Sequence, residues 1–171
     1  MKILSYLFVL VTFSSVAEVN RAWWVVYIYE PKSSSFLEYS ASEIHRDIIL
    51  IDIYTCNSMK YFTPDQCGEI KRNNAQFEIH GDFNKDGGGE VWNVGIAKFK
   101  NGNFAHTVIV RNKATNKIEQ VLTVENKKPK FAILSEYKGS INLFFCMECG
   151  DFAKIVWNGN KWVLKWPEPY G

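Results

Sequence analysis

The fold of this chain is decided by two adjacent runs of β-branched and aromatic residues, Val91-Trp92-Asn93-Val94-Gly95-Ile96-Ala97-Lys98-Phe99 and Phe104-Ala105-His106-Thr107-Val108-Ile109-Val110-Arg111. Residues of these types favour extended strands because their side chains pack well on a pleated surface. Asn101-Gly102 lies between the runs, and an Asn-Gly pair readily takes the two positive φ angles of a tight hairpin turn. The stretch therefore predicts an antiparallel β-hairpin.

Runs of similar composition occur on both sides of this hairpin, and turn-forming residues separate most of them. The predicted strands are residues 22–30, 48–54, 118–125, 131–137, 141–146, 152–157 and 161–166. Short strands at regular spacing are typical of antiparallel β proteins, whereas βαβ units would need a helix between successive strands. We therefore expect a mainly β fold, arranged as an antiparallel meander, a sandwich or a blade-like sheet.

One helix signal interrupts the strands. Thr63 is a suitable N-cap, Pro64 suits the first helical position, and Gln66 completes a capping box. The sequence predicts one short α-helix over about residues 64–74.

The first residues have the order of a secretory signal peptide. Lys2 is followed by an apolar run over residues 3–13 and by the small residues Ser15-Val16-Ala17. The run is shorter than the about 20 apolar residues that a membrane-spanning helix needs. We expect cleavage near Ala17, so that residues 1–17 are a signal peptide, and one soluble β-rich domain over residues 18–171 without a membrane anchor. The expected location is periplasmic or secreted.

The composition argues against a nucleic-acid partner. The chain has 20 Lys and Arg residues against 18 Asp and Glu residues, which gives a formal net charge of +2. Binding to nucleic acid needs a concentrated basic face that neutralises phosphates. The aromatic content is high, with six Trp, eight Tyr and twelve Phe, and it allows a sugar-binding surface as well as an aromatic core.

The segment between the helix and the hairpin carries the one motif with specific chemistry. It reads Gly-Asp-Phe-Asn-Lys-Asp-Gly-Gly-Gly-Glu over residues 81–90. Its oxygen-bearing residues have the spacing by which a tight loop directs several ligands at one hard cation, and calcium suits such a flexible all-oxygen loop better than magnesium. The alternative is a polar turn that uses Asp, Asn and Gly only for their backbone conformation.

Together with Val91-Trp92-Asn93-Val94-Gly95, this segment resembles the calcium loop and following strand of the FG-GAP or VCBS repeat family. The resemblance covers only residues 81–95. It implies a calcium site, with metal-ligand roles for Asp82, Asn84, Asp86, the backbone of Gly88, and Glu90 in place of the usual Asp. A propeller needs several blades, and the single copy here excludes a complete one. What the resemblance implies is a blade-like sheet within another β fold.

Four cysteines in an exported chain are most simply explained as a disulfide framework. The favoured pairs are Cys56–Cys67, next to the predicted helix, and Cys146–Cys149, which would close a tight loop. Pairing across the two clusters stays open. A redox site at Cys146 and Cys149 would need the first cysteine at a helix N-terminus, and the sequence predicts strands on both sides instead. A zinc site is disfavoured in an oxidising compartment.

No catalytic constellation is recognisable. The histidines, His45, His80 and His106, lie far apart in the sequence, and no serine has the surroundings of a catalytic nucleophile. Trp157, Trp162 and Trp166 form either the edge of a packed core or a flat platform for a sugar, and the lysines that alternate with them favour the core.

The sequence thus indicates an exported, non-enzymatic binding protein that is stabilised by calcium and disulfides. An inhibitor or immunity-type partner of another exported protein is the first interpretation. A carbohydrate or cell-wall binding module that recognises a polysaccharide is the second. An enzyme whose site is assembled from distant residues is the third.

Overall fold

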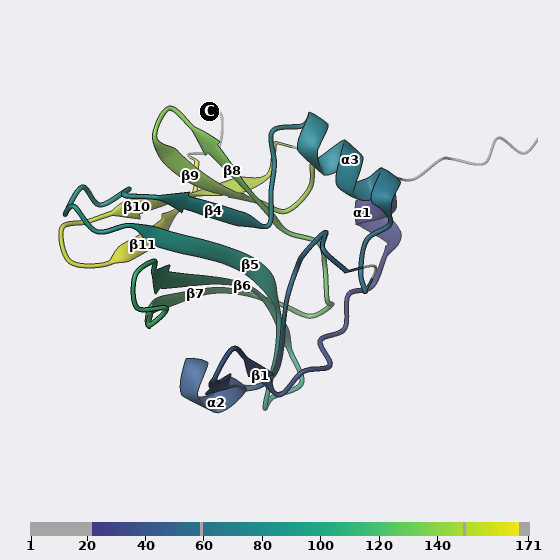
Figure 1. Cartoon of the computed structure of the whole chain (residues 1–171). Coiled ribbons are helices and arrows are strands. Elements are labelled where there is room, and N and C mark those ends of the chain that lie inside the picture. Colours follow the sequence, from purple (N-terminus) through teal and green to yellow (C-terminus); the bar gives the residue numbers. More distant parts are fainter. Residues whose placement is uncertain (1–21, 59, 149, 168–171) are drawn as a thin grey trace, which may run out of the picture.

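Two antiparallel sheets form the framework of the protein in a computed structural model that describes residues 22–58, 60–148 and 150–167 (Figure 1). This arrangement confirms the predicted mainly β, antiparallel fold. The expected signal peptide, residues 1–17, lies outside the described residues. Among the described residues, no helix has the length and apolar character needed to span a bilayer.

The larger sheet contains the predicted hairpin. Its five strands are β3 (Ile48–Ile53), β4 (Glu78–Gly81), β5 (Glu90–Phe99), β6 (Phe104–Asn112) and β7 (Ile118–Asn126). They follow the order β3-β5-β6-β7, and β4 also pairs with β5. The hairpin turn differs from the prediction, because Gly102 has a positive φ of 85° and Asn101 does not. The amide of Gly102 donates to the carbonyl of Phe99 at 3.0 Å, so a wider turn joins β5 to β6.

Strands β3 and β4 occupy the same edge of β5, one after the other. Ile53, at the end of β3, lies opposite Gly95, and Glu78, at the start of β4, lies opposite Asn93. The chain therefore leaves this edge after β3 and returns to it at β4. The intervening residues 54–77 include the only long helix of the described residues, α3 (Pro64–Arg72). This interruption of the sheet edge positions the cleft described below.

The smaller sheet is formed by four consecutive strands in the order β11-β10-β9-β8. They are β8 (Ile133–Tyr137), β9 (Ser140–Phe144), β10 (Phe152–Trp157) and β11 (Trp162–Lys165). Apart from shifts of one or two residues at their ends, these strands are the ones predicted from sequence.

The two sheets share one apolar core, which the alternation of residues along each strand produces. The inner face of the larger sheet contributes Trp92, Val94, Ile96, Val108 and Val110. The smaller sheet contributes Ile141, Leu143, Ile155 and Trp162. The rings of Trp92 and Trp162 meet edge to face with centroids 4.7 Å apart. Trp162 therefore belongs to the core, as predicted, whereas Trp166 is 53% exposed and stacks on Phe145.

A second cluster covers part of the opposite face of the larger sheet. The hairpin of β1 (Ser35–Phe36) and β2 (Tyr39–Ser40) and the one-turn helix α2 (Ala41–Ile44) pack there, against Ile51, Ala97 and Ile109. The layer is small, and Figure 1 shows it at one end of the sheet only.

The helices partly correct the sequence prediction. In α3, Thr63 and Gln66 form the predicted capping box, but α2 and α1 (Trp23–Val26) are additional helices of one turn each. The predicted strand over residues 22–30 is wrong: after α1 the chain runs without a strand partner to residue 34. Two of its aromatic residues, Trp24 and Tyr29, are buried, whereas Tyr27 is 51% exposed. Tyr29 is held by ring packing, since it lies among Tyr54, Phe62 and Phe131.

Candidate functional site

The predicted metal loop connects β4 to β5, and the two strands are paired up to the residues at which the loop begins and ends. Gly81, the last residue of β4, pairs directly with Glu90, the first residue of β5. The side chains of Asp82 and Asp86 are exposed, whereas Glu90 is 2% exposed. One carboxylate oxygen from each of these three residues lies within 4.8 Å of the other two. The fold thus brings together both predicted aspartates and the glutamate.

Hydrogen bonds within the loop fix its tight course. Asp82 accepts from the backbone amides of Asp86 at 3.2 Å and Gly87 at 3.1 Å. The Oδ1 atom of Asn84 also accepts from the Asp86 amide, at 3.0 Å. Lys85 and Gly87 have positive φ angles of 61° and 86°, which reverse the chain direction within a few residues. These contacts form the polar turn that the alternative interpretation requires. The same turn holds carboxylate oxygens of Asp82, Asp86 and Glu90 within 4.8 Å of one another.

The charge of the cluster is not balanced by protein cations. No Lys, Arg or His forms an ion pair with Asp82, Asp86 or Glu90 in the part of the chain that the structure describes. Burial raises the pKa of the Glu90 carboxyl above its ordinary value, and the charges of the two aspartates raise it further. The Phe83 amide donates to Glu90 Oε2 at 3.0 Å, and this hydrogen bond lowers the pKa of the carboxyl.

The remaining predicted ligands lie beside Asp86. The side-chain amide of Asn84 donates to Asp86 Oδ2 at 2.8 Å, and the Gly88 amide donates to Asp86 Oδ1 at 2.7 Å. Ligand roles for Asn84 and for the carbonyl of Gly88 stay predictions. The three carboxylates supply hard oxygen donors, which fit calcium better than a softer metal.

The disulfide Cys56–Cys67 is present as predicted and joins the segment after β3 to the first turns of α3. The second predicted pair includes Cys149, which lies outside the described residues, so this pairing stays a prediction. His80 contacts Glu78 at 2.8 Å, and His45 packs against Phe99.

A cleft of about 870 Å³ lies where the edge of the larger sheet is interrupted. Its walls include Ile53, Cys56, Lys71, Phe77, Asn93 and Arg111. At one end the buried guanidinium of Arg111 donates from Nε and Nη2 to Asn93 Oδ1, at 3.0 and 2.8 Å, and lies over the Phe36 ring. Sequence reasoning missed this cleft because residues far apart in the chain build it.

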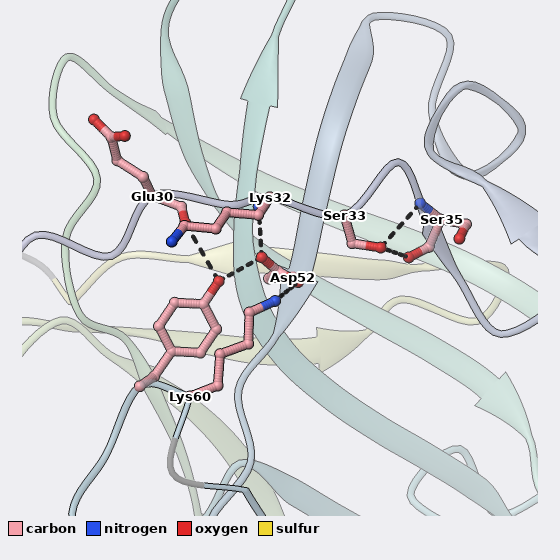
Figure 2. Close-up of polar contacts among 7 residues, drawn as sticks. Glu30, Lys32, Ser33, Ser35, Asp52 and Lys60 are labelled. Carbon is pink, nitrogen blue, oxygen red and sulfur yellow. Dashed lines mark hydrogen bonds and ion pairs between the residues drawn. The ribbon is translucent and has the colours of Figure 1, made fainter.

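Asp52 is one of the residues that line this cleft. Its side chain anchors several segments, as the polar contacts in Figure 2 show. The Lys60 amine and the Lys32 amide each donate to its carboxylate at 2.6 Å, and the Tyr61 hydroxyl also donates to it. Burial alone would raise the pKa of the Asp52 carboxyl, but these hydrogen bonds outweigh it and hold the pKa below its ordinary value. Tyr61 also donates to the carbonyl of Glu30, so the network ties residues 30–32 to β3.

Comparison of the chain with protein-family models, with curated proteins and with solved structures gave no match.

Proposed function

We propose that this protein is a calcium-stabilised, non-enzymatic binding protein that works in the periplasm or outside the cell and binds another exported protein. The observation that carries the calcium part is the group of three carboxylates of Asp82, Asp86 and Glu90, within 4.8 Å of one another and without an ion-pair partner among the described residues. Like charges at this separation repel one another, and a divalent cation removes the repulsion.

Calcium would act on the fold through Glu90. This residue begins β5, and its backbone pairs with Gly81 on one side and Asn112 on the other. A cation held between Glu90 and the two aspartates would fix the β4–β5 loop to the central strands of the larger sheet. The proposed extracellular location suits this role, because calcium there is concentrated enough to fill sites with dissociation constants of about 10⁻⁴–10⁻³ M.

The test of calcium binding is thermal unfolding of the mature protein, residues 18–171, with calcium and with a chelator. We expect calcium at about 100 times its dissociation constant to add about 2.7 kcal/mol to the free energy of unfolding. The Asp82→Ala and Asp86→Ala variants should lose this response. Glu38→Gln, which alters an exposed acid in the turn between β1 and β2, should keep it. If the unchanged protein unfolds at the same temperature in calcium and in chelator, the calcium site is refuted.

For the protein partner, the cleft beside α3 is the surface that we assign. Its size suits inserted side chains, and its lining combines apolar residues with the charges of Lys71, Glu78 and Arg111. The disulfide Cys56–Cys67 and the Asp52 network hold two of its walls in place, which limits the entropy lost on binding.

The partner is sought by capture with the mature protein from the envelope and the secreted fraction of its own cells. A captured protein is then purified and titrated with the unchanged protein and with Lys71→Glu, which reverses one charge in the cleft wall. We expect the affinity to fall about tenfold, which equals about 1.4 kcal/mol. Lys117→Glu, in the exposed β6–β7 turn, is the matched control and should bind normally. Equal losses in the two variants, or no loss in either, would count against the cleft.

A further inference from the structure

The outer face of the smaller sheet has a hollow of about 600 Å³. Ile141, Leu143 and Ile155 point into the core, so the residues that alternate with them face outward. The hollow is lined by Ser135, Tyr137, Lys138, Ser140, Asn142, Phe144, Phe152 and Lys154. It is separate from the cleft beside α3 and from the calcium loop, since it shares no lining residue with either.

Aromatic rings make an apolar wall in this hollow. Phe144 and Phe152 are direct partners across β9 and β10, and their rings stack with centroids 5.0 Å apart and an interplanar angle of 28°. Both rings are only partly buried, and Tyr137 is 63% exposed. Rings on an open sheet face present flat surfaces to which the C–H face of a sugar ring can stack, because the face of an aromatic ring is electron-rich.

A polar group that has no partner lies in the middle of the hollow. Asn142 is 7% exposed, and its Oδ1 atom has no hydrogen-bond partner among the described residues. Its neighbours across the sheet are Ser135 on β8 and Lys154 on β10. An unsatisfied buried amide costs about 1–3 kcal/mol. The Oδ1 atom is buried where it stands, and a half-turn of the amide about χ2 exchanges it with the nitrogen, so that the oxygen can meet a ligand hydroxyl from the position now held by Nδ2.

The charge around the hollow is positive. Lys138 and Lys154 line it, and no Asp or Glu does. Lys154 also lies directly opposite Lys165, on β11, and like charges in this position are unfavourable. None of these lysines forms an ion pair within the described residues. An anionic group on a ligand would relieve the repulsion between Lys154 and Lys165.

We propose that this hollow binds an acidic sugar, a pyranose that carries a carboxylate. The ring stacks on Phe144 and Phe152, its hydroxyl groups bond to Asn142, and the carboxylate pairs with Lys154. This proposal names specific residues and a ligand class for the second interpretation, a module that binds a polysaccharide. It does not depend on the proposed calcium loop or on the protein partner.

The test is isothermal titration of the mature protein with two probes of matched length, trigalacturonate and the neutral sugar maltotriose. We expect trigalacturonate to bind at least about tenfold more tightly than maltotriose, a difference of about 1.4 kcal/mol. Added salt should weaken the binding of trigalacturonate, since salt screens exposed charges. Failure of trigalacturonate to bind, or equal binding of both sugars, would overturn the proposal.

Three variants locate the site. Phe152→Ala should weaken trigalacturonate binding at least about tenfold, and Lys154→Met should remove most of the preference for the acidic sugar. Trp166→Ala is the matched control, because Trp166 is an exposed aromatic residue outside the hollow. Lys154→Met changes only an exposed side chain, so it tests the site even if Phe152→Ala fails to fold. The proposal would be overturned if Lys154→Met bound trigalacturonate as tightly as the unchanged protein does. It would also be overturned if Phe152→Ala lost affinity for a captured protein but kept its affinity for trigalacturonate.

Discussion

The side chain of Gln120 on β7 makes both hydrogen bonds that a strand partner would make to the backbone of Trp162 on β11. Its Nε2 atom donates to the Trp162 carbonyl at 2.6 Å, and its Oε1 atom accepts from the Trp162 amide at 2.7 Å. Trp162 in turn packs on Trp92 of the other sheet. Gln120 thus joins β7 to β11 at one edge of the two sheets.

Replacement of this glutamine should therefore loosen the edge in a graded way. Gln120→Ala leaves both backbone groups of Trp162 without their partner and should cost about 1–3 kcal/mol. Gln120→Glu keeps the acceptor but places a charged carboxylate oxygen against the Trp162 carbonyl in place of the donor, so it should cost at least as much. Urea unfolding followed by tryptophan fluorescence measures both. Equal stability of the two variants and the unchanged protein would show that water replaces the glutamine without cost.

Gly95 is required where β3 approaches β5. A Cβ atom there would lie 2.1 Å from the carbonyl oxygen of Asp52 and 2.8 Å from the Cα atom of Ile53, both of them backbone atoms that cannot turn aside. Gly95→Ala should therefore separate the strands and cost at least about 2–3 kcal/mol, as overpacking does.

Gly68, in the middle of α3, is the matched control for Gly95. A Cβ atom at Gly68 would have only the end of the Arg72 side chain within reach, at 3.4 Å. Gly68→Ala should therefore raise the stability by about 0.5–1 kcal/mol, since alanine is the better helix former. Thermal unfolding of both variants gives the comparison. A Gly95→Ala protein as stable as Gly68→Ala would contradict the close approach of β3 and β5.

The sequence predicts the parts of the fold whose signals are local. The capping box of Thr63 and Gln66 and the strand runs on either side of Asn101-Gly102 are such signals, and both elements form. Ser40 and Glu43 carry the same box pattern at α2, so that helix could have been predicted as well. The run of residues 22–30 misleads because its aromatic composition suits a strand, while ring contacts with Phe62 and Phe131 decide its conformation.

The candidate sites divide in the same way. The acidic loop of residues 81–90 is contiguous, and its spacing predicts that Asp82, Asp86 and Glu90 meet. The cleft is built from segments that are far apart in the sequence, whereas the hollow lies on the consecutive strands β8, β9 and β10. Asn142 and Arg111 have no distinctive sequence neighbours, and only the register of the sheets places them in these surfaces.

Asp52 should stabilise the protein through an interaction that acid removes. Because its pKa is lowered in the fold, its contribution is complete well above the ordinary value of about 3.9 and is lost as the pH falls through the lowered pKa. Asp52→Asn should cost about 1–3 kcal/mol at pH 7 and flatten the pH dependence of stability below about pH 4.

Asp47 serves as the control for Asp52. It pairs with Arg46 at 3.3 Å, but the two side chains are 48% and 90% exposed, so Asp47→Asn should change the stability by less than about 0.5 kcal/mol. Chemical unfolding at a series of pH values measures both variants. Similar costs for the two substitutions would show that the Asp52 network does not anchor the cleft.

His106 should cause a loss of stability as the pH falls, and this loss should occur at higher pH than the loss that comes from protonation of Asp52. Its side chain is 2% exposed, its Nδ1 atom has no hydrogen-bond partner among the described residues, and its ring packs against Phe145. Burial, and to a smaller extent the charge of Lys130, lower its pKa from 6.5 to about 4. Between these two values the unfolded chain binds a proton that the folded protein excludes.

The free energy of unfolding should therefore fall by about 3 kcal/mol as the pH drops from about 6.5 to about 4, provided that other groups are constant. The measurement is urea unfolding at intervals of half a pH unit, together with an NMR titration of the His106 ring. His106→Gln keeps a neutral polar side chain of similar size, and it should remove this slope while leaving the Asp52 range at lower pH intact. If the ring of His106 titrates near its ordinary pKa, or the slope persists in His106→Gln, the histidine is not the group that responds.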